Sequence, residues 1–221
     1  MKFLAIALVA MVFSMFFLIG DVISGDIYIG NIAEQRGDFR RAFKEYLEVA
    51  NEDEADSKEA KLKVGLYYFR GKGVPRDFKK ARKWFKAAAN EGVALAQNYL
   101  GMIYKNGLGI KPNDTLARVW FYKSAVAGNI PARFNLGEIY RENGRMSMAA
   151  LCFVSVYLYG NRTMEALARK EMLKFSVIGW ARGADKEIAQ KPDNEIIKPC
   201  MISKKQAAVA GFRAGYEMIF R

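Results

Sequence analysis

The 221-residue sequence contains no histidine, only two cysteines and only five prolines. Without histidine, Ser–His–Asp and Cys–His catalytic groups are impossible, and the commonest metal ligand of proteins is missing. Cys152 and Cys200 alone cannot form a structural zinc site. The sequence also lacks a Gly-x-x-x-x-Gly-Lys-Ser/Thr phosphate loop and a Ser-x-x-Lys motif. We therefore expect no enzyme activity, no cofactor, no metal and no small-molecule substrate.

Charge is distributed unevenly along the chain, whose formal net charge is +12. Residues 25–57 hold four basic and nine acidic side chains, whereas residues 58–92 hold 11 basic and three acidic ones. Such a field can attract an anionic partner or an anionic membrane surface. The plainer alternative is a solvated surface that keeps the protein soluble.

The N-terminus resembles a targeting segment. Residues 3–19 form an apolar run with a single serine, and Lys2 precedes it. This is the plan of a secretory signal, with Val22 and Ser24 suited to a cleavage site. The run is also at the short limit for a membrane span. We expect residues 1–24 to be either a cleaved signal peptide or a retained anchor. The remaining chain would then be exported, either periplasmic or anchored to the inner membrane and facing the periplasm.

The sequence repeats itself with a period of 36 residues, because residues 60–92 align with residues 96–128. A shorter third copy covers residues 132–160, and residues 30–50 have the same short spacing. Identity at restrictive residue types with a fixed period is typical of stacked helical repeats. The identical pairs are Gly65 and Gly101, Tyr68 and Tyr104, Gly71 and Gly107, Gly73 and Gly109, Ala81 and Ala117, Trp84 and Trp120, and Gly92 and Gly128.

Local patterns within one repeat predict two helices and a turn. Ala81, Trp84, Phe85 and Ala88 are spaced by three and four residues, which places them on one apolar stripe of a helix. The preceding loop contains glycines for left-handed turns, and Asp77 is suited to cap the second helix. The low proline content also favours helices over strands. We therefore predict an all-α fold, a short α-solenoid of stacked antiparallel helix pairs after the N-terminal apolar helix.

These residues resemble the Sel1-like repeat family, a relative of the tetratricopeptide repeat. The second copy departs slightly from the family pattern at Ile110, Asn113 and Ser124. In the first full copy the pattern is met by Val64, Gly65, Tyr68, residues 71–74, Asp77, Ala81, Trp84, Ala87 and Ala88.

The resemblance, read with the spacing, gives a domain organisation. Beyond residue 162 the period fades, as it commonly does where a terminal repeat must meet water. We expect a TPR-like repeat over residues 25–57, Sel1-like repeats over 58–92 and 93–129, a short Sel1/TPR-like repeat over 130–162, and a capping helix with a tail over 163–221.

What the resemblance implies about function is a bacterial, non-enzymatic scaffold or adaptor of the cell envelope. Such a scaffold would bind a protein partner on the concave face of its solenoid. Two alternatives stay open: a periplasmic immunity protein that neutralises a delivered toxin, and a membrane-associated binder of anionic envelope lipid or glycan. Nucleic acid is not an expected partner, since the aromatics near the basic residues fit repeat core positions.

Two groups of residues are candidates for binding. On the first helices of the repeats, which line the concave side of such stacks, the predicted exposed positions are Lys61, Tyr67, Arg70, Gln97, Lys105, Arg133, Glu138 and Arg141. The rival group is a basic patch on the second helix of the first full copy, made of Arg76, Lys79, Lys80, Arg82, Lys83 and Lys86.

The two cysteines can form a disulfide in an oxidising compartment. Cys152 stands at the repeat position of Trp84 and Trp120, which we expect to be buried, and Cys200 lies in the tail. A bridge would pin the tail to the third repeat. The alternative is two unpaired thiols, one of them part of the core.

Overall fold

The computed structural model describes residues 27–52, 56–174 and 200. The regular elements α2–α10 in these ranges are α-helices, and consecutive helices pack together from α2 to α5 and from α6 to α10. The predicted all-α repeat fold is thus confirmed. The predicted signal or anchor segment, residues 1–24, lies outside the described residues. None of the helices in the described part of the chain has the length and apolar character needed to cross a membrane.

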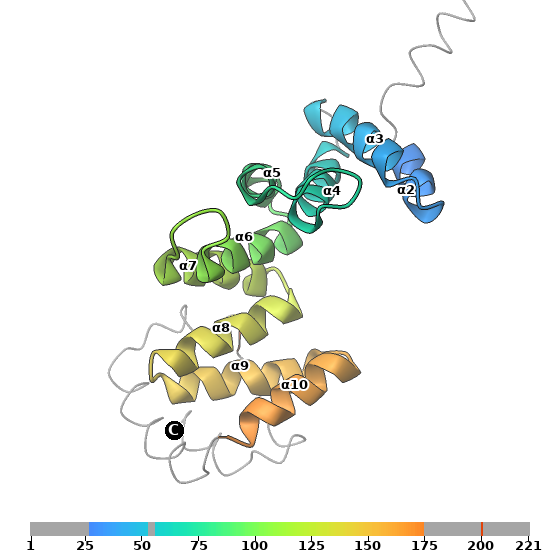
Figure 1. The fold of residues 1–221 in the computed structure, drawn as a ribbon. Coiled ribbons are helices and arrows are strands. Elements are labelled where there is room, and N and C mark those ends of the chain that lie inside the picture. Colours follow the sequence, from blue (N-terminus) through green and yellow to red (C-terminus); the bar gives the residue numbers. More distant parts are fainter. Residues whose placement is uncertain (1–26, 53–55, 175–199, 201–221) are drawn as a thin grey trace, which may run out of the picture. The chain divides into compact units, whose positions relative to one another are not determined.

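The chain divides into two compact units between Glu91 and Gly92. Unit 1 is built from two helix pairs, in which α2 packs on α3, α3 on α4, and α4 on α5 (Figure 1). Its core includes Ala42, Tyr46 and Val64, with Trp84 packed against it. The helices of unit 1 are α2 (Ile27–Gln35), α3 (Phe39–Asn51), α4 (Ser57–Arg70) and α5 (Phe78–Asn90).

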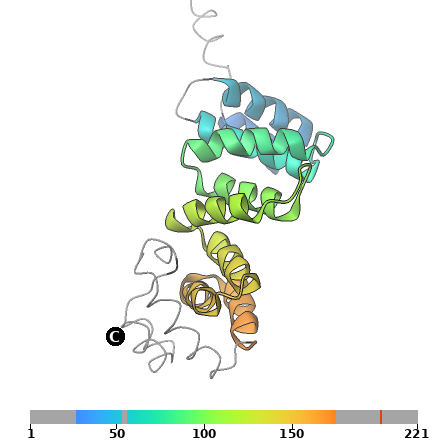
Figure 2. The same cartoon turned by 90° about the vertical axis from the view of Figure 1, so that its left-hand side faces the viewer.

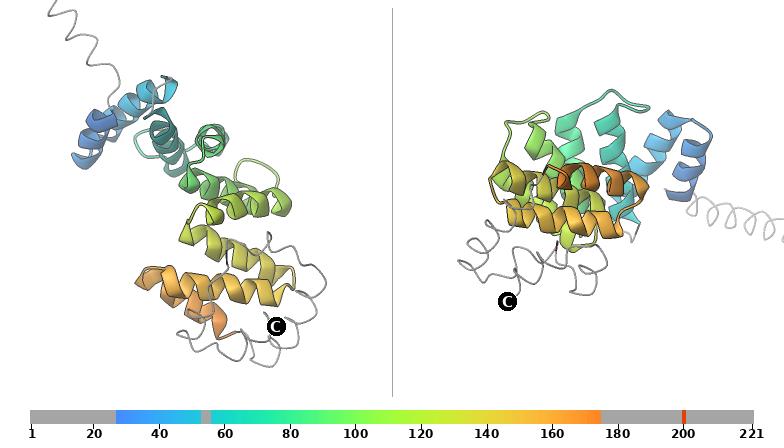
Figure 3. Two further views of the ribbon diagram at one scale, coloured as in Figure 1. Left: turned by 180° about the vertical axis from the view of Figure 1, so that it is seen from behind. Right: turned by 90° about the horizontal axis from the view of Figure 1, so that it is seen from below.

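Unit 2 contains two further helix pairs and a last single helix. From α7 onward each helix contacts the one before it, and α10 also touches α8. The bundle of α8, α9 and α10 can be followed from the side and from behind (Figure 2; Figure 3). The helices of unit 2 are α6 (Ala94–Asn106), α7 (Asp114–Val126), α8 (Ile130–Glu142), α9 (Met146–Tyr159) and α10 (Arg162–Met172).

A glycine on the first helix of each pair faces an aromatic ring on the second helix. A methyl group added at Gly101 would lie 2.5 Å from two ring carbons of Phe121. At Gly65 the same methyl group would meet Phe85 at 2.6 Å. Gly30 with Tyr46, and Gly137 with Phe153, repeat the arrangement. The ring therefore fills the space that a side chain on the first helix would need, and the two helices approach closely.

The turns within the pairs have the chemistry that the repeat pattern predicts. Gly71 and Gly107 end α4 and α6 in the left-handed conformation, with φ of 68° and 66°. The side chain of Asp77 accepts a hydrogen bond of 2.9 Å from the backbone N–H of Lys80 and so caps α5, as predicted. Asn113 caps α7 in the same way, although it replaces the aspartate.

Helix α9 differs from its counterparts because every residue from Ser147 to Val156 is buried. A helix that is apolar all round is covered on all sides. Cys152, at its centre, is joined by a disulfide to Cys200, and both residues are buried. The bridge ties a residue 48 positions further along the chain to the core of the pair formed by α8 and α9.

Candidate functional site

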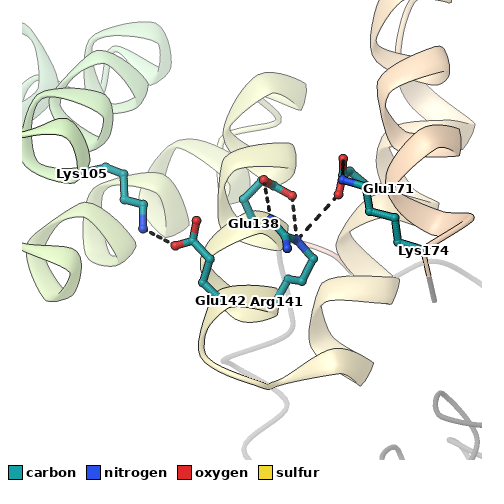
Figure 4. Close-up of polar contacts among 6 residues, drawn as sticks. All are labelled: Lys105, Glu138, Arg141, Glu142, Glu171 and Lys174. Carbon is teal, nitrogen blue, oxygen red and sulfur yellow. Dashed lines mark hydrogen bonds and ion pairs between the residues drawn. The ribbon is translucent and has the colours of Figure 1, made fainter. Parts of the chain in front are cut away.

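Charged side chains from three helices meet on one side of unit 2. Lys105, near the end of α6, pairs with Glu142 at the end of α8 (Figure 4). It also lies 3.4 Å from the carboxylate of Asp114, the first residue of α7. Lys105 therefore links its own helix pair to the next one along the chain.

The network continues from α8 to α10. Arg141 donates two hydrogen bonds to the carboxylate of Glu138, of 3.0 and 3.2 Å. Its guanidinium also lies 3.7 Å from Glu171 on α10, and Lys174 donates a bond of 2.5 Å to Glu171. Figure 4 shows these groups in one row. We call the side chains of Lys105, Glu138, Arg141, Glu142, Glu171 and Lys174 the polar face of unit 2.

The pKa values of the cations reflect these contacts. Partial burial alone would lower the pKa of Lys105, but the hydrogen bond and charge of Glu142, with Asp114, raise it above its ordinary value. The hydrogen bond and charge of Glu138 likewise raise the pKa of Arg141. Both cations are thus held in their charged form by neighbouring carboxylates.

Arg133 lies apart from this network, near the start of α8. One of its terminal nitrogens donates a 2.9 Å hydrogen bond to the hydroxyl of Ser155, and its guanidinium lies 5.8 Å from the ring centre of Tyr159. Burial lowers the pKa of Arg133. These contacts of Arg133 are with neutral groups of α9, in contrast to the carboxylates that hold Arg141.

In unit 1 the corresponding polar groups lie on α4. Lys61 pairs with Glu91 at 2.7 Å. Lys63 pairs with Glu34 at 2.9 Å, and the hydroxyl of Tyr46 donates a 3.0 Å hydrogen bond to the same carboxylate. Partial burial would raise the pKa of Glu34, but the bonds from Lys63 and Tyr46 and the charge of Lys63 lower it. This cluster joins α2, α3 and α4.

Two of the first-helix residues that were predicted to be exposed are buried, so the prediction is wrong for them. Tyr67 is buried, with its ring 5.7 Å from that of Tyr46 and 6.1 Å from that of Phe43. Gln97 is buried within the run from Ala96 to Asn98. A first helix inside a stack is covered by its own partner helix and by the neighbouring pair. More of its surface is therefore buried than a single apolar stripe in its sequence would predict.

The remaining predicted positions keep some exposure but are mostly engaged. Arg70 is exposed at the end of α4, whereas Lys61, Lys105, Arg133, Glu138 and Arg141 are half-buried. The sequence patterns did not reveal Glu142, Asp114 and Glu171, because their pairing depends on how helices far apart in sequence cross.

The predicted basic patch lies on the outer side of α5. Arg82 is half-buried, and the other five residues are exposed: Arg76, Lys79, Lys80, Lys83 and Lys86. Lys80 lies 3.9 Å from Asp77, which makes only a long ion pair. The patch is thus a solvent-facing cationic surface.

Comparison with known proteins assigns the repeats. A family model described as Sel1 repeat matches residues 58–93 and 94–129. The chain contains two Sel1 repeats. The first Sel1 repeat covers α4 and α5, and the second covers α6 and α7. The resemblance drawn from the glycine, alanine and tryptophan register is therefore confirmed.

Two solved bacterial structures resemble the chain. The Sel1 repeat protein of Oxalobacter formigenes is 24% identical, with a TM-score of 0.52, and the match covers 84% of this chain and 71% of that one. A protective antigen of uropathogenic Escherichia coli with an SLR fold is 22% identical, with a TM-score of 0.49. That match covers 88% of this chain and 48% of the antigen. No curated protein matches the sequence.

Sel1 repeats generally form scaffolds for protein–protein interaction, and the Sel1 repeats here have the same helical construction. Among the described residues, no three carboxylate or cysteine side chains gather in a way that could hold a metal ion. The polar features of the structure are ion pairs between helices and the open cationic surface of α5. What these arrangements offer chemically is recognition of a charged or hydrogen-bonding partner surface.

Proposed function

We propose that the chain is a non-enzymatic scaffold that holds a protein partner on the side formed by its first helices. The observation that carries this proposal is the polar face of unit 2. It brings together cations and carboxylates from α6, α8 and α10, elements that are far apart in the sequence. Charges of both signs in a fixed arrangement give a protein interface its register and its selectivity.

Stability alone explains this arrangement poorly. Glu142 and Lys174 remain exposed, and ion pairs at such positions add little to the free energy of unfolding. Lys105 instead holds two carboxylates in place while keeping a quarter of its side chain accessible. A partner can therefore reach a preorganised set of donors and acceptors, which lowers the entropic cost of binding.

An envelope location completes the proposal. The N-terminal sequence pattern suggests export, and the buried disulfide between Cys152 and Cys200 suits an oxidising compartment such as the periplasm. The Sel1 repeat protein of Oxalobacter formigenes, whose fold resembles that of the chain, is bacterial, which fits a bacterial envelope protein.

The proposal is tested by site-specific photo-crosslinking in the cells that make the protein. Asn106 and Glu142 occupy equivalent exposed positions at the ends of α6 and α8, so a photoreactive residue placed there samples the polar face. Thr115, exposed on α7, serves as the matched control. We expect one discrete protein adduct from Asn106 and Glu142 and none from Thr115. Equal adducts at all three positions, or adducts from Thr115 alone, would contradict the proposed binding side.

A further inference from the structure

The outer side of α5 carries cations that the protein itself does not neutralise. Lys79, Lys83 and Lys86 are exposed, and among the described residues no carboxylate forms an ion pair with any of them. Lys80 lies 3.9 Å from Asp77 and 5.3 Å from the ring centre of Tyr68, and Arg76 packs against the ring of Phe78. We call the side chains of Arg76, Lys79, Lys80, Lys83 and Lys86 the cationic face of α5.

The second Sel1 repeat provides an internal control for this face. Thirty-six residues after Lys79, Lys80, Lys83 and Lys86, helix α7 has Thr115, Leu116, Val119 and Tyr122. The packing positions, by contrast, are kept, since Ala81 and Phe85 correspond to Ala117 and Phe121, and all four are buried. The repeat fold therefore does not require lysine at the outer positions of its second helix.

Helix α3 provides a second control. Two of its three basic residues are balanced on the same helix, because Arg41 pairs with Glu45 and Lys44 with Glu48, each at 3.7 Å. In α5 no acidic residue follows the lysines at helical spacing, so Lys79 and Lys83 face each other as like charges. Such pairs destabilise a helix slightly, and a negative surface outside the protein would relieve the repulsion.

The chemistry of the face indicates what kind of negative surface fits. Protein interfaces are depleted in lysine and rely on buried aromatic or apolar anchors. On α5, Phe85 is buried, and Phe78 and Trp84 are half-buried, with Trp84 packed against the core of unit 1. Lysine ammonium groups on flexible stems are point charges with no preferred bidentate geometry. They suit a surface whose charge is laterally uniform better than a partner of defined shape.

We propose that the cationic face of α5 binds the surface of a membrane that contains anionic lipids. Lysines that approach such a surface gain electrostatic free energy individually, and the gain is lost as salt screens the charges. The lysines of this face and the residues of the polar face of unit 2 are different sets, so the two proposals can be tested separately.

The test is co-sedimentation of the full chain with phosphatidylcholine vesicles, with and without phosphatidylglycerol. Binding to the neutral vesicles gives the baseline for any contribution of the N-terminal apolar run. We expect phosphatidylglycerol to increase binding, and the triple variant K79E/K80E/K83E to bind the anionic vesicles more than about a hundredfold more weakly than the wild type. The neutral variant K79Q/K80Q/K83Q should show a smaller loss of binding to phosphatidylglycerol vesicles. Circular dichroism should confirm that both variants remain folded.

A matched control separates position from net charge. The variant K58E/K111E/K170E changes the net charge by the same amount at exposed lysines away from α5. It should keep most of the binding to phosphatidylglycerol vesicles. Equal losses in both triple variants, or no preference of the wild type for anionic vesicles, would overturn the proposal. Binding to a polyglutamate peptide that depends on α5, without vesicle binding, would make the face a protein-docking site and would also overturn it.

Discussion

Reduction of the disulfide between Cys152 and Cys200 is expected to lower the free energy of unfolding of unit 2 by about 4 kcal/mol. The bridge joins residues 48 positions apart, and a closed loop of this length strongly restricts the unfolded chain. Both cysteines are buried, so after reduction the two sulfurs must also separate to van der Waals distance within the packed core. Thermal and chemical unfolding followed by circular dichroism, with and without a phosphine reductant, measures the effect.

The double variant C152A/C200A is the control for this experiment. It should be about as unstable as the reduced wild type, and the reductant should not change its unfolding. If the native protein showed two free thiols on alkylation and mass mapping, or if the reductant left its unfolding unchanged, the disulfide would not contribute as expected.

Replacement of Gly101 by alanine is expected to lower the free energy of unfolding by about 2 kcal/mol. The added methyl group would lie 2.5 Å from two ring carbons of Phe121, which is itself fully packed. The helix can relieve this overlap only by moving away from α7 or by forcing the ring off its rotamer. Alanine is otherwise the better helix former, by about 0.5–1 kcal/mol, so a loss of stability here reports on packing alone.

A double-mutant cycle identifies the ring as the cause. Phe121→Val removes the ring carbons that the new methyl group would meet, and in that background Gly101→Ala should cost little or even stabilise the protein. The same cycle can be made with Gly65 and Phe85 in the other repeat, where the approach is 2.6 Å. Equal costs of the alanine in the presence and absence of the ring would contradict the close packing of the two helices.

Much of the fold could be predicted from the sequence because the repeat residues are constrained locally. The turn after α4 requires a left-handed residue, which is Gly71, and the cap of α5 requires only that Asp77 accept a hydrogen bond from the N–H of Lys80 three residues later. Such requirements recur with the period and can be recognised in one sequence. Cys152 is buried as predicted, but Trp84 and Trp120 at the same repeat position are only half-buried, so the repeat position alone does not explain its burial.

The candidate site was less predictable because its contacts join distant residues. Whether Lys105 meets Glu142, and Arg141 meets Glu171, depends on how α6, α8 and α10 cross. Glu171 lies beyond the last repeat, so the alignment of the repeats could not identify it as part of the site. Tyr67 and Gln97 were wrongly expected to be exposed, because helical spacing alone does not tell which sides of a helix are covered by neighbouring pairs.

The central claim is that the polar face of unit 2 holds a protein partner, and a charge exchange tests it most directly. In an Asp114→Asn background, the variant K105E/E142K keeps an ion pair between α6 and α8 but reverses its direction. Affinity for the protein captured from Asn106 and Glu142 is then measured by titration, with the melting temperature as the control for folding. We predict an unchanged melting temperature and an affinity at least about tenfold lower. Unchanged affinity in a folded exchange variant would contradict the claim.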